Sequence, residues 1–221
     1  LIALDNPGQG GHSLDGSHYQ STTVSGHLIF GLDGPTKDLY YVHLYQNVRI
    51  LCRIVQELKG IDTSRVFVNG ASQGGGMGLA VCALNPDLVN RAAILYPFLT
   101  DFRCVWELNA DQLAYDGLRY YARWFDADGS RIDEICTQLS YIDSVNFARL
   151  VQCPVLFGTG LADVVVPPEA QFAAYNALSC PKRHLVYPEY GHEEIGAFDE
   201  KIIDFFCSSD AQRALELLDH L

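Results

Sequence analysis

Basic residues are scarce in this sequence. Its 221 residues include 15 Lys and Arg against 27 Asp and Glu, which leaves a formal net charge of −12. A surface this acidic repels the phosphates of nucleic acids, and no cluster of Lys and Arg offsets that repulsion locally. We therefore expect no nucleic-acid partner.

Long apolar runs are also missing. No stretch approaches the roughly eighteen consecutive apolar residues that a membrane-spanning helix needs. No charged segment followed by an apolar core opens the chain, so no signal peptide is visible. We expect no membrane partner.

The seven cysteines lack the spacing of a metal site or of a disulfide framework. Their number is odd and no two of them form a CxxC pair. Several lie in apolar runs, as small buried hydrophobic side chains do. We expect a reducing compartment.

Apolar runs of strand length alternate with longer stretches of helical period, the pattern of a parallel sheet wrapped by helices. Strands are expected at 1–5, 65–69, 92–96, 154–158 and 183–187, and helices at 39–58, 77–84, about 110–125, 131–138, 144–149, 168–178, 195–207 and 209–219. Helices between the strands imply crossover connections and helices on both faces of the sheet. The expected class is α/β.

The domain organisation follows from the same pattern. Residues 1–221 show no repeat or linker, so we expect a single domain. The chain opens without Met on an apolar run, which predicts that upstream sequence with further strands is missing. Residues 97–152 form a helical insertion rich in Tyr, Phe and Trp. These aromatic residues predict either a cap over a pocket or a small core of the insertion itself.

The stretch Gly70-Ala71-Ser72-Gln73-Gly74 fits the pattern G-x-S-x-G between an apolar strand and a helix. In that setting the serine stands on a strained turn that lifts its hydroxyl above the edge of the sheet. Side chains two residues before and after Ser72 would collide there, so both glycines are expected to relieve a clash. A dinucleotide-binding fingerprint would need the pattern G-x-G-x-x-G, and a phosphate-binding P-loop would need a Lys. Neither is present at this turn. Ser72 is the candidate nucleophile of an α/β-hydrolase fold.

A serine nucleophile needs a base, and His192 is the best placed of the seven histidines. It directly follows the last strand, whereas His184 lies inside that strand and His220 in the tail. The other four precede Ser72, contrary to the order serine, acid, histidine of this fold.

The third member of a triad orients the histidine and stabilises its charged form. Asp163 follows the strand before the last one, which places it one strand away from the loop of His192. Asp101, which follows an earlier strand, is the weaker rival.

Stabilising an oxyanion requires backbone donors. The N–H of Gln73 is the first candidate, because it opens the helix after Ser72. The second donor usually comes from a loop after an earlier strand. If residues 1–5 are the fourth strand of the fold, that loop lies upstream of Leu1 and is absent from this chain.

Several stretches together resemble carbohydrate esterase family 7, the acetyl xylan esterases and cephalosporin-C deacetylases. They are GQG at 8–10, GASQGG at 70–75, YPFLTDF at 96–102, LSYID at 139–143, NFA at 146–148, GLAD at 160–163, PP at 167–168, FAAYN at 172–176 and HE at 192–193. The resemblance covers nearly the whole chain.

The resemblance implies deacetylation of xylo-oligosaccharides and of cephalosporin-type acetate esters by a triad of Ser72, Asp163 and His192. It also implies the Gln73 N–H in the oxyanion hole, no metal or other cofactor, and cytoplasmic homo-hexamers whose sites face an internal cavity. The family's Arg-Gly-Gln-Gly loop reads Pro7-Gly8-Gln9-Gly10 here, which removes a guanidinium that could pack locally or across an oligomer contact.

Two alternatives stay open at this stage, because fold alone does not determine function. One is a peptidase or a dienelactone-type hydrolase on the same scaffold. The other is an inactive fragment that serves only as a binding or assembly module.

Overall fold

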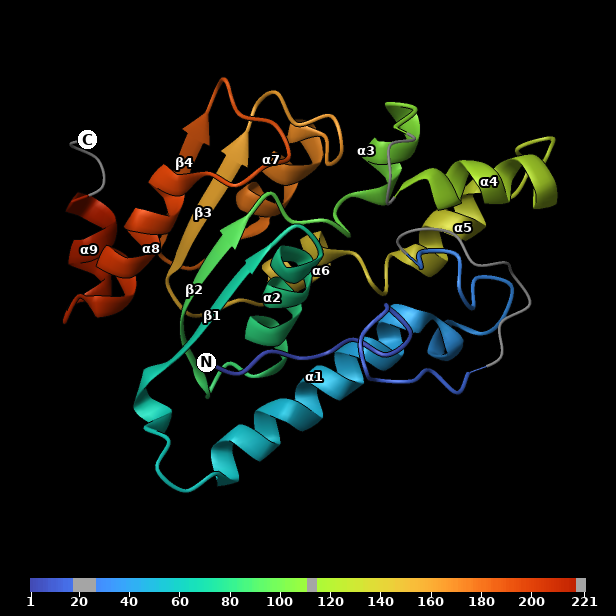
Figure 1. Ribbon diagram of the computed structural model, residues 1–221. Coiled ribbons are helices and arrows are strands. Elements are labelled where there is room, and N and C mark those ends of the chain that lie inside the picture. Colours follow the sequence, from blue (N-terminus) through green and yellow to red (C-terminus); the bar gives the residue numbers. More distant parts are fainter. Residues whose placement is uncertain (18–26, 111–114, 218–221) are drawn as a thin grey trace. The chain divides into compact units, whose positions relative to one another are not determined.

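The computed structural model describes residues 1–17, 27–110 and 115–217. The chain forms two compact units, each made of two segments (Figure 1). One unit comprises residues 60–110 and 143–221, and the other comprises residues 1–59 and 111–142.

The first of these units is built on a parallel sheet in the order β1-β2-β3-β4. Its strands are β1 (Val66–Ala71), β2 (Val89–Leu95), β3 (Val155–Gly160) and β4 (Lys182–Tyr187). All three strand pairs are parallel, and Ile94 pairs with both Gly70 and Phe157 in the register. Since parallel strands run in one direction, the loops that follow them emerge at the same edge of the sheet.

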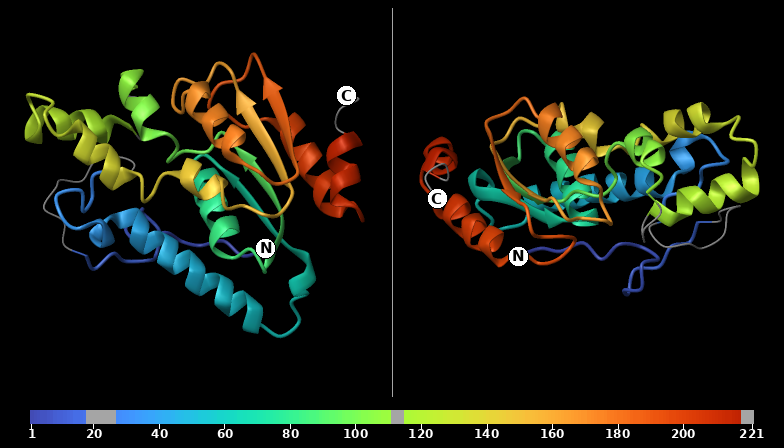
Figure 2. Two further views of the ribbon diagram at one scale, coloured as in Figure 1. Left: turned by 180° about the vertical axis from the view of Figure 1, so that it is seen from behind. Right: turned by 90° about the horizontal axis from the view of Figure 1, so that it is seen from above.

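Helices cover both faces of this sheet (Figure 2). The helical segments of the unit are η2 (Thr63–Arg65), α2 (Gln73–Leu84), α3 (Phe102–Glu107), α6 (Ser144–Ala148), α7 (Pro168–Ala177), α8 (Gly196–Cys207) and α9 (Ala211–Leu217). Residues of α2, α6 and α7 pack on one face, and residues of α8 and α9 pack on the other. The predicted parallel sheet with helices on both faces is confirmed.

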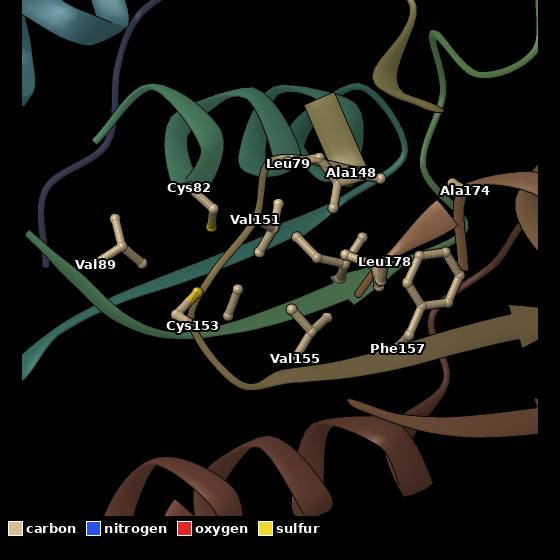
Figure 3. Packing of buried hydrophobic residues seen from close by; sticks show 12 residues of the cluster. Leu79, Cys82, Val89, Ala148, Val151, Cys153, Val155, Phe157, Ala174 and Leu178 are labelled. Atoms are coloured by element: carbon tan, nitrogen blue, oxygen red, sulfur yellow. The ribbon is translucent and has the colours of Figure 1, made fainter. Parts of the chain in front are cut away.

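Alternation along the strands divides the core into two clusters. Ala92 and Ile94 of β2 point into the cluster beneath α2, whereas Ala93 and Leu95 point into the cluster beneath α8. Figure 3 shows the first cluster, where Leu79 of α2 lies among residues of the sheet, α6 and α7. Each fully buried aliphatic side chain stabilises the fold by about 1.5–3 kcal/mol, so the two clusters hold the strand ends rigidly.

The other unit contains η1 (Thr36–Asp38), α1 (Tyr40–Glu57), α4 (Asp116–Phe125) and α5 (Ile132–Leu139). Gln138 joins its segments, because its amide accepts from Thr36 Oγ1 at 2.9 Å and donates to the Gly34 carbonyl at 3.0 Å. Tyr45 of α1 likewise donates to the Ile142 carbonyl at 2.8 Å.

The expected strand at 1–5 is wrong. Among the described residues none forms a strand pairing with this segment, and Ile2 is 48% exposed. An apolar run becomes a strand only where a neighbour takes up its N–H and C=O groups. Within the described residues the sheet therefore has four strands rather than five.

The region 97–152 contains the predicted helices near 131–138 and 144–149, as α5 and α6. The helix expected at 110–125 is present as α4 from Asp116, and residues 111–114 lie outside the described part. Helix α3 was not predicted. Tyr121 is fully buried whereas Trp124 is 71% exposed, so the aromatic residues here do not share one role. A cap over a pocket stays a prediction.

The cysteines only partly follow the expectation of burial. Cys52, Cys82 and Cys153 are buried, but Cys207 is exposed at the end of α8. The apolar run that contains Cys207 buries Phe205 instead, since a helix turns successive side chains to different faces. All seven cysteines are free thiols.

Candidate active site

Ser72 occupies a strained turn between β1 and α2. Its φ and ψ are 53° and −121°, in a region that residues other than glycine rarely adopt. Its backbone is held on both sides, because Ser72 N donates to the Leu95 carbonyl at 3.0 Å and Phe98 N donates to the Ser72 carbonyl at 2.9 Å. The end of β2 thus fixes the turn that presents the hydroxyl.

The two glycines of the turn have different reasons to be there. A Cβ at Gly70 would lie 2.1 Å from the Gly74 carbonyl oxygen, so a side chain is excluded at this position as predicted. The same expectation is wrong for Gly74, where a Cβ would meet nothing within 4 Å. Only a side chain at position 70 would clash, because it is the backbone of Gly74 that lies close to Gly70.

His192 lies between Ser72 and Asp163 and contacts both. Its Nε2 is 2.9 Å from Ser72 Oγ, and its Nδ1 is 2.9 Å from Asp163 Oδ2. A carboxylate only accepts hydrogen bonds, so Nδ1 carries the proton and Nε2 is left to accept from the serine hydroxyl. The imidazole is 20% exposed and the Asp163 side chain is fully buried.

Asp163 is held by four hydrogen bonds. Its Oδ1 accepts from the backbone N–H groups of Val165 and Val166, both at 2.9 Å. Its Oδ2 accepts from His192 and from Gln171 Nε2, the latter at 3.1 Å. Charge-assisted hydrogen bonds of this kind are what a buried carboxylate needs to stay in place.

The loop of His192 is fitted closely to the end of β3. A Cβ at Gly160 would lie 2.5 Å from the Tyr190 carbonyl oxygen. The Ala162 N–H also donates to that carbonyl, at 3.0 Å. The loop after β4 therefore rests directly on the loop after β3, which brings the histidine to the acid.

Tyr96 supports His192 from the end of β2. Its ring centroid lies 4.5 Å from that of His192, and its hydroxyl donates to the Glu193 carbonyl at 2.8 Å. Its φ of 31° shows a strained backbone. Burial, together with the charge of Asp163, raises the pKa of the Tyr96 phenol, which therefore stays protonated and able to donate.

The rival candidates His184 and Asp101 make contacts within the fold and not with Ser72. His184 Nε2 is 2.8 Å from Thr159 Oγ1, and its ring stacks on Tyr175 with centroids 4.1 Å apart. Burial and two neighbouring cations lower the pKa of His184 to about 4, so it is neutral near pH 7. Asp101 caps α3 by accepting from Cys104 N at 3.1 Å. His220 lies outside the described residues.

Gln73 is the first residue of α2 and directly follows Ser72. The first N–H groups of a helix have no partner inside the helix, and they carry the positive end of its dipole. The position suits a donor to an oxyanion. The second donor, expected upstream of Leu1, stays a prediction.

Among the described residues, no group of three or more His, Cys, Asp or Glu side chains is arranged to hold a metal ion. Over the same ranges no helix is both long and apolar enough to cross a membrane.

Residues 1–209 match the family described as acetyl xylan esterase (AXE1). The chain belongs to this family. The predicted resemblance to acetyl xylan esterases is thereby confirmed. Ser72, Asp163 and His192 all lie within the matched residues.

An acetyl esterase and two acetyl xylan esterases are similar to this chain in sequence or in structure. Acetyl esterase Axe7A of Xylanibacter ruminicola is 31% identical over 169 residues, which are 76% of this chain and 36% of that protein. The crystal structure of acetyl xylan esterase 1 from Thermoanaerobacterium sp. JW/SL YS485 matches with 40% identity and a TM-score of 0.88. The acetyl xylan esterase from Paenibacillus sp. R4 matches with 31% identity and a TM-score of 0.86.

The chain spans only part of the length of these relatives. The chain covers 63% of each of the two solved structures, while 91% of the chain is aligned with each. A puromycin hydrolase matches with 19% identity and a TM-score of 0.54, a likeness that shows the α/β-hydrolase fold alone. The predicted fold is confirmed.

Sequence reasoning did not identify Gln171 or Tyr96 as parts of the site. Gln171 is a fully buried polar residue next to the buried Ala170 on α7, and an amide inside an apolar helix face is a signal worth following. Tyr96 left no comparable signal, because its position beside His192 depends on how two distant loops meet.

Proposed function

We propose that this chain carries the catalytic site of a serine esterase that removes acetyl groups from acetylated xylo-oligosaccharides and related acetate esters. The proposal rests on one observation: Asp163, His192 and Ser72 form a continuous hydrogen-bonded series at one edge of the sheet, with 2.9 Å at both links. Membership of the acetyl xylan esterase family supports the choice of an acetyl ester.

Catalysis begins with attack of Ser72 Oγ on the ester carbonyl carbon. His192 Nε2 takes the hydroxyl proton, and Asp163 stabilises the imidazolium that forms. The N–H of Gln73 donates to the tetrahedral oxyanion. The bond to the sugar oxygen then breaks, and that oxygen leaves with the proton from His192.

Water completes the cycle. His192 takes a proton from the water, whose oxygen attacks the acetyl group on Ser72. The second tetrahedral intermediate collapses, acetate leaves, and the proton returns to Ser72 Oγ. Atoms balance without any further reactant, since ester and water give alcohol and acetic acid.

The test is Ser72→Ala in the full-length protein, with release of acetate from acetylated xylo-oligosaccharide as the readout. Loss of a triad nucleophile lowers kcat by about 10⁶-fold, so we expect activity at the background rate. The control is Ser208→Ala, because Ser208 Oγ makes local hydrogen bonds to the backbone of Asp210, donating to its carbonyl and accepting from its N–H. Wild-type turnover in Ser72→Ala would exclude the mechanism.

The substrate class is tested by comparing acetylated xylo-oligosaccharide with cephalosporin C, a peptide amide and a long-chain ester. We expect both acetate esters to be hydrolysed and the other two to be poor substrates. Faster hydrolysis of the amide would favour a peptidase instead. Binding of the sugar without any hydrolysis would favour a binding or assembly module.

Assembly and location are proposed on the same family basis. We propose a homo-oligomer, a hexamer, that works in the cytoplasm. Sedimentation of the full-length protein tests the first statement, because a hexamer and a monomer differ sixfold in mass. Cell fractionation tests the second.

A further inference from the structure

Gln171 is a buried amide that the proposed mechanism leaves without a role. It lies on α7, is 0% exposed, and stands beside Ala170 and Ala174, which are also fully buried. Placing an amide in such surroundings costs free energy unless its polar atoms find partners. Its Oε1 is buried without a hydrogen-bond partner within the described part of the chain. Fold stability alone therefore does not explain a glutamine here.

The hydrogen bonds of the amide nitrogen explain why a glutamine occupies this position. Nε2 donates to Asp163 Oδ2 at 3.1 Å and to the Val166 carbonyl at 2.7 Å. Both partners are pure acceptors, so the NH₂ end of the amide must face them, and the reverse orientation would oppose oxygen to oxygen. The orientation of Gln171 is thus set by its contacts.

These contacts close a ring around the acid. Val166 N donates to Asp163 Oδ1, the Val166 carbonyl accepts from Gln171, and Gln171 donates to Asp163 Oδ2. The backbone donors fix only Oδ1. The oxygen that contacts His192 is Oδ2, and within the described residues its other donor is Gln171. Rotation about the Cβ–Cγ bond moves both carboxylate oxygens together, and Gln171 opposes this rotation at Oδ2. Without the amide, the backbone donors at Oδ1 oppose it alone, so Oδ2 can tilt further away from the imidazole.

We infer that Gln171 is a positioning residue, whose amide holds Oδ2 of Asp163 against His192 Nδ1. The inference rests on the proposed esterase function. It assigns to α7 a part in the reaction although no atom of Gln171 reaches the serine. It also predicts that removing the amide affects kcat rather than substrate binding.

The experiment uses Gln171→Met in the full-length protein, which keeps the length of the side chain and removes the donor. We expect kcat for p-nitrophenyl acetate to fall about tenfold to hundredfold, the effect of misplacing a catalytic group by up to an ångström. KM should stay within about twofold, because no contact to substrate is lost. The ¹H NMR resonance of the His192 Nδ1 proton, which is hydrogen-bonded to Asp163, should shift or broaden.

Gln171→Glu supplies a readout that a packing role would not move. A protonated carboxyl group can still donate to Asp163, whereas an ionised one repels it. The activity of this variant relative to wild type should therefore rise as the pH falls. Gln138→Met is the matched control, since Gln138 is a hydrogen-bonded glutamine of the other unit, and it should keep wild-type kcat.

A folded Gln171→Met protein with kcat within twofold of wild type would overturn the inference, as would a change in KM alone. If neither Gln171 variant folds, the residue is structural and the inference is equally overturned. Failure of the proposed function is a separate result. In that case wild type itself shows no acetate release that depends on Ser72.

Discussion

Replacing Asp163 by asparagine makes a specific prediction, because the surrounding donors determine which way the new amide lies. Two backbone N–H groups, from Val165 and Val166, point at Oδ1 from 2.9 Å. The asparagine must place its oxygen there, since its NH₂ group would oppose both donors. Its NH₂ group then takes the position of Oδ2 and faces His192 Nδ1. There it also opposes one donor, Gln171 Nε2, whereas the reverse orientation would oppose the two backbone donors.

That orientation of the amide reverses the tautomer of His192. Nδ1 of His192 must now accept from the amide, so the proton moves to Nε2, 2.9 Å from Ser72 Oγ. A protonated Nε2 cannot take the hydroxyl proton. The wrong tautomer in a serine triad lowers kcat by about 10⁴-fold, equivalent to about 5.4 kcal/mol in the activation free energy.

The assay is steady-state hydrolysis of p-nitrophenyl acetate by full-length Asp163→Asn. The variant should fold, because the amide keeps the shape of the carboxyl group and its contacts to the two backbone donors. Asp62→Asn, at an exposed turn, serves as the control and should keep wild-type kcat. Retention of a tenth or more of wild-type kcat in Asp163→Asn would refute the reasoning about the tautomer.

Three further results follow from the described contacts. Gly70→Ala should lower the free energy of unfolding by about 1–3 kcal/mol in urea titration, because its Cβ meets a carbonyl oxygen at 2.1 Å. Gly74→Ala should leave the free energy of unfolding unchanged, because the space around its Cβ is open. Equal losses of stability in the two variants would contradict the account. Tyr96→Phe removes the hydrogen bond to Glu193 but keeps the ring, so kcat should fall several-fold with KM unchanged, and an unaltered kcat would argue against support of the His192 loop. Burial raises the pKa of Asp143 to about 6, above an unfolded value of about 3.9, so the protonated form favours the fold. Its stabilising contribution is complete below about pH 4 and is lost as the pH rises through 6, and Asp143→Asn should flatten the measured stability over that range.

The sequence pattern predicts the two central strands well because β2 and β3 are largely buried on both faces. Continuous apolar runs of this length, such as 92–96 and 154–158, are typical of strands buried on both faces of a parallel sheet. The run at 1–5 looks the same in composition and forms no strand. The difference lies in a pairing neighbour, which a local pattern does not encode.

The candidate catalytic triad was predictable from sequence because its members occupy positions that follow strands in a known order along the chain. Ser72, Asp163 and His192 each follow a strand, and parallel strands bring such loops to one edge. The catalytic role assigned to them stays a prediction until it is tested. Gln171 and Tyr96 were missed because their positions arise from packing between helix, strand end and loop. The clash expected at Gly74 was wrong for a related reason, since the direction of one Cα–Cβ bond decides it.

The most direct measurement of the central claim is covalent labelling of the nucleophile. Full-length protein is treated with a fluorophosphonate, which phosphonylates a serine oxygen activated by a neighbouring imidazole, and is then digested and analysed by mass spectrometry. The account predicts one adduct, on Ser72, formed far more slowly in the Asp163→Asn variant. A reactive wild-type protein that carries its adduct on another residue would contradict it.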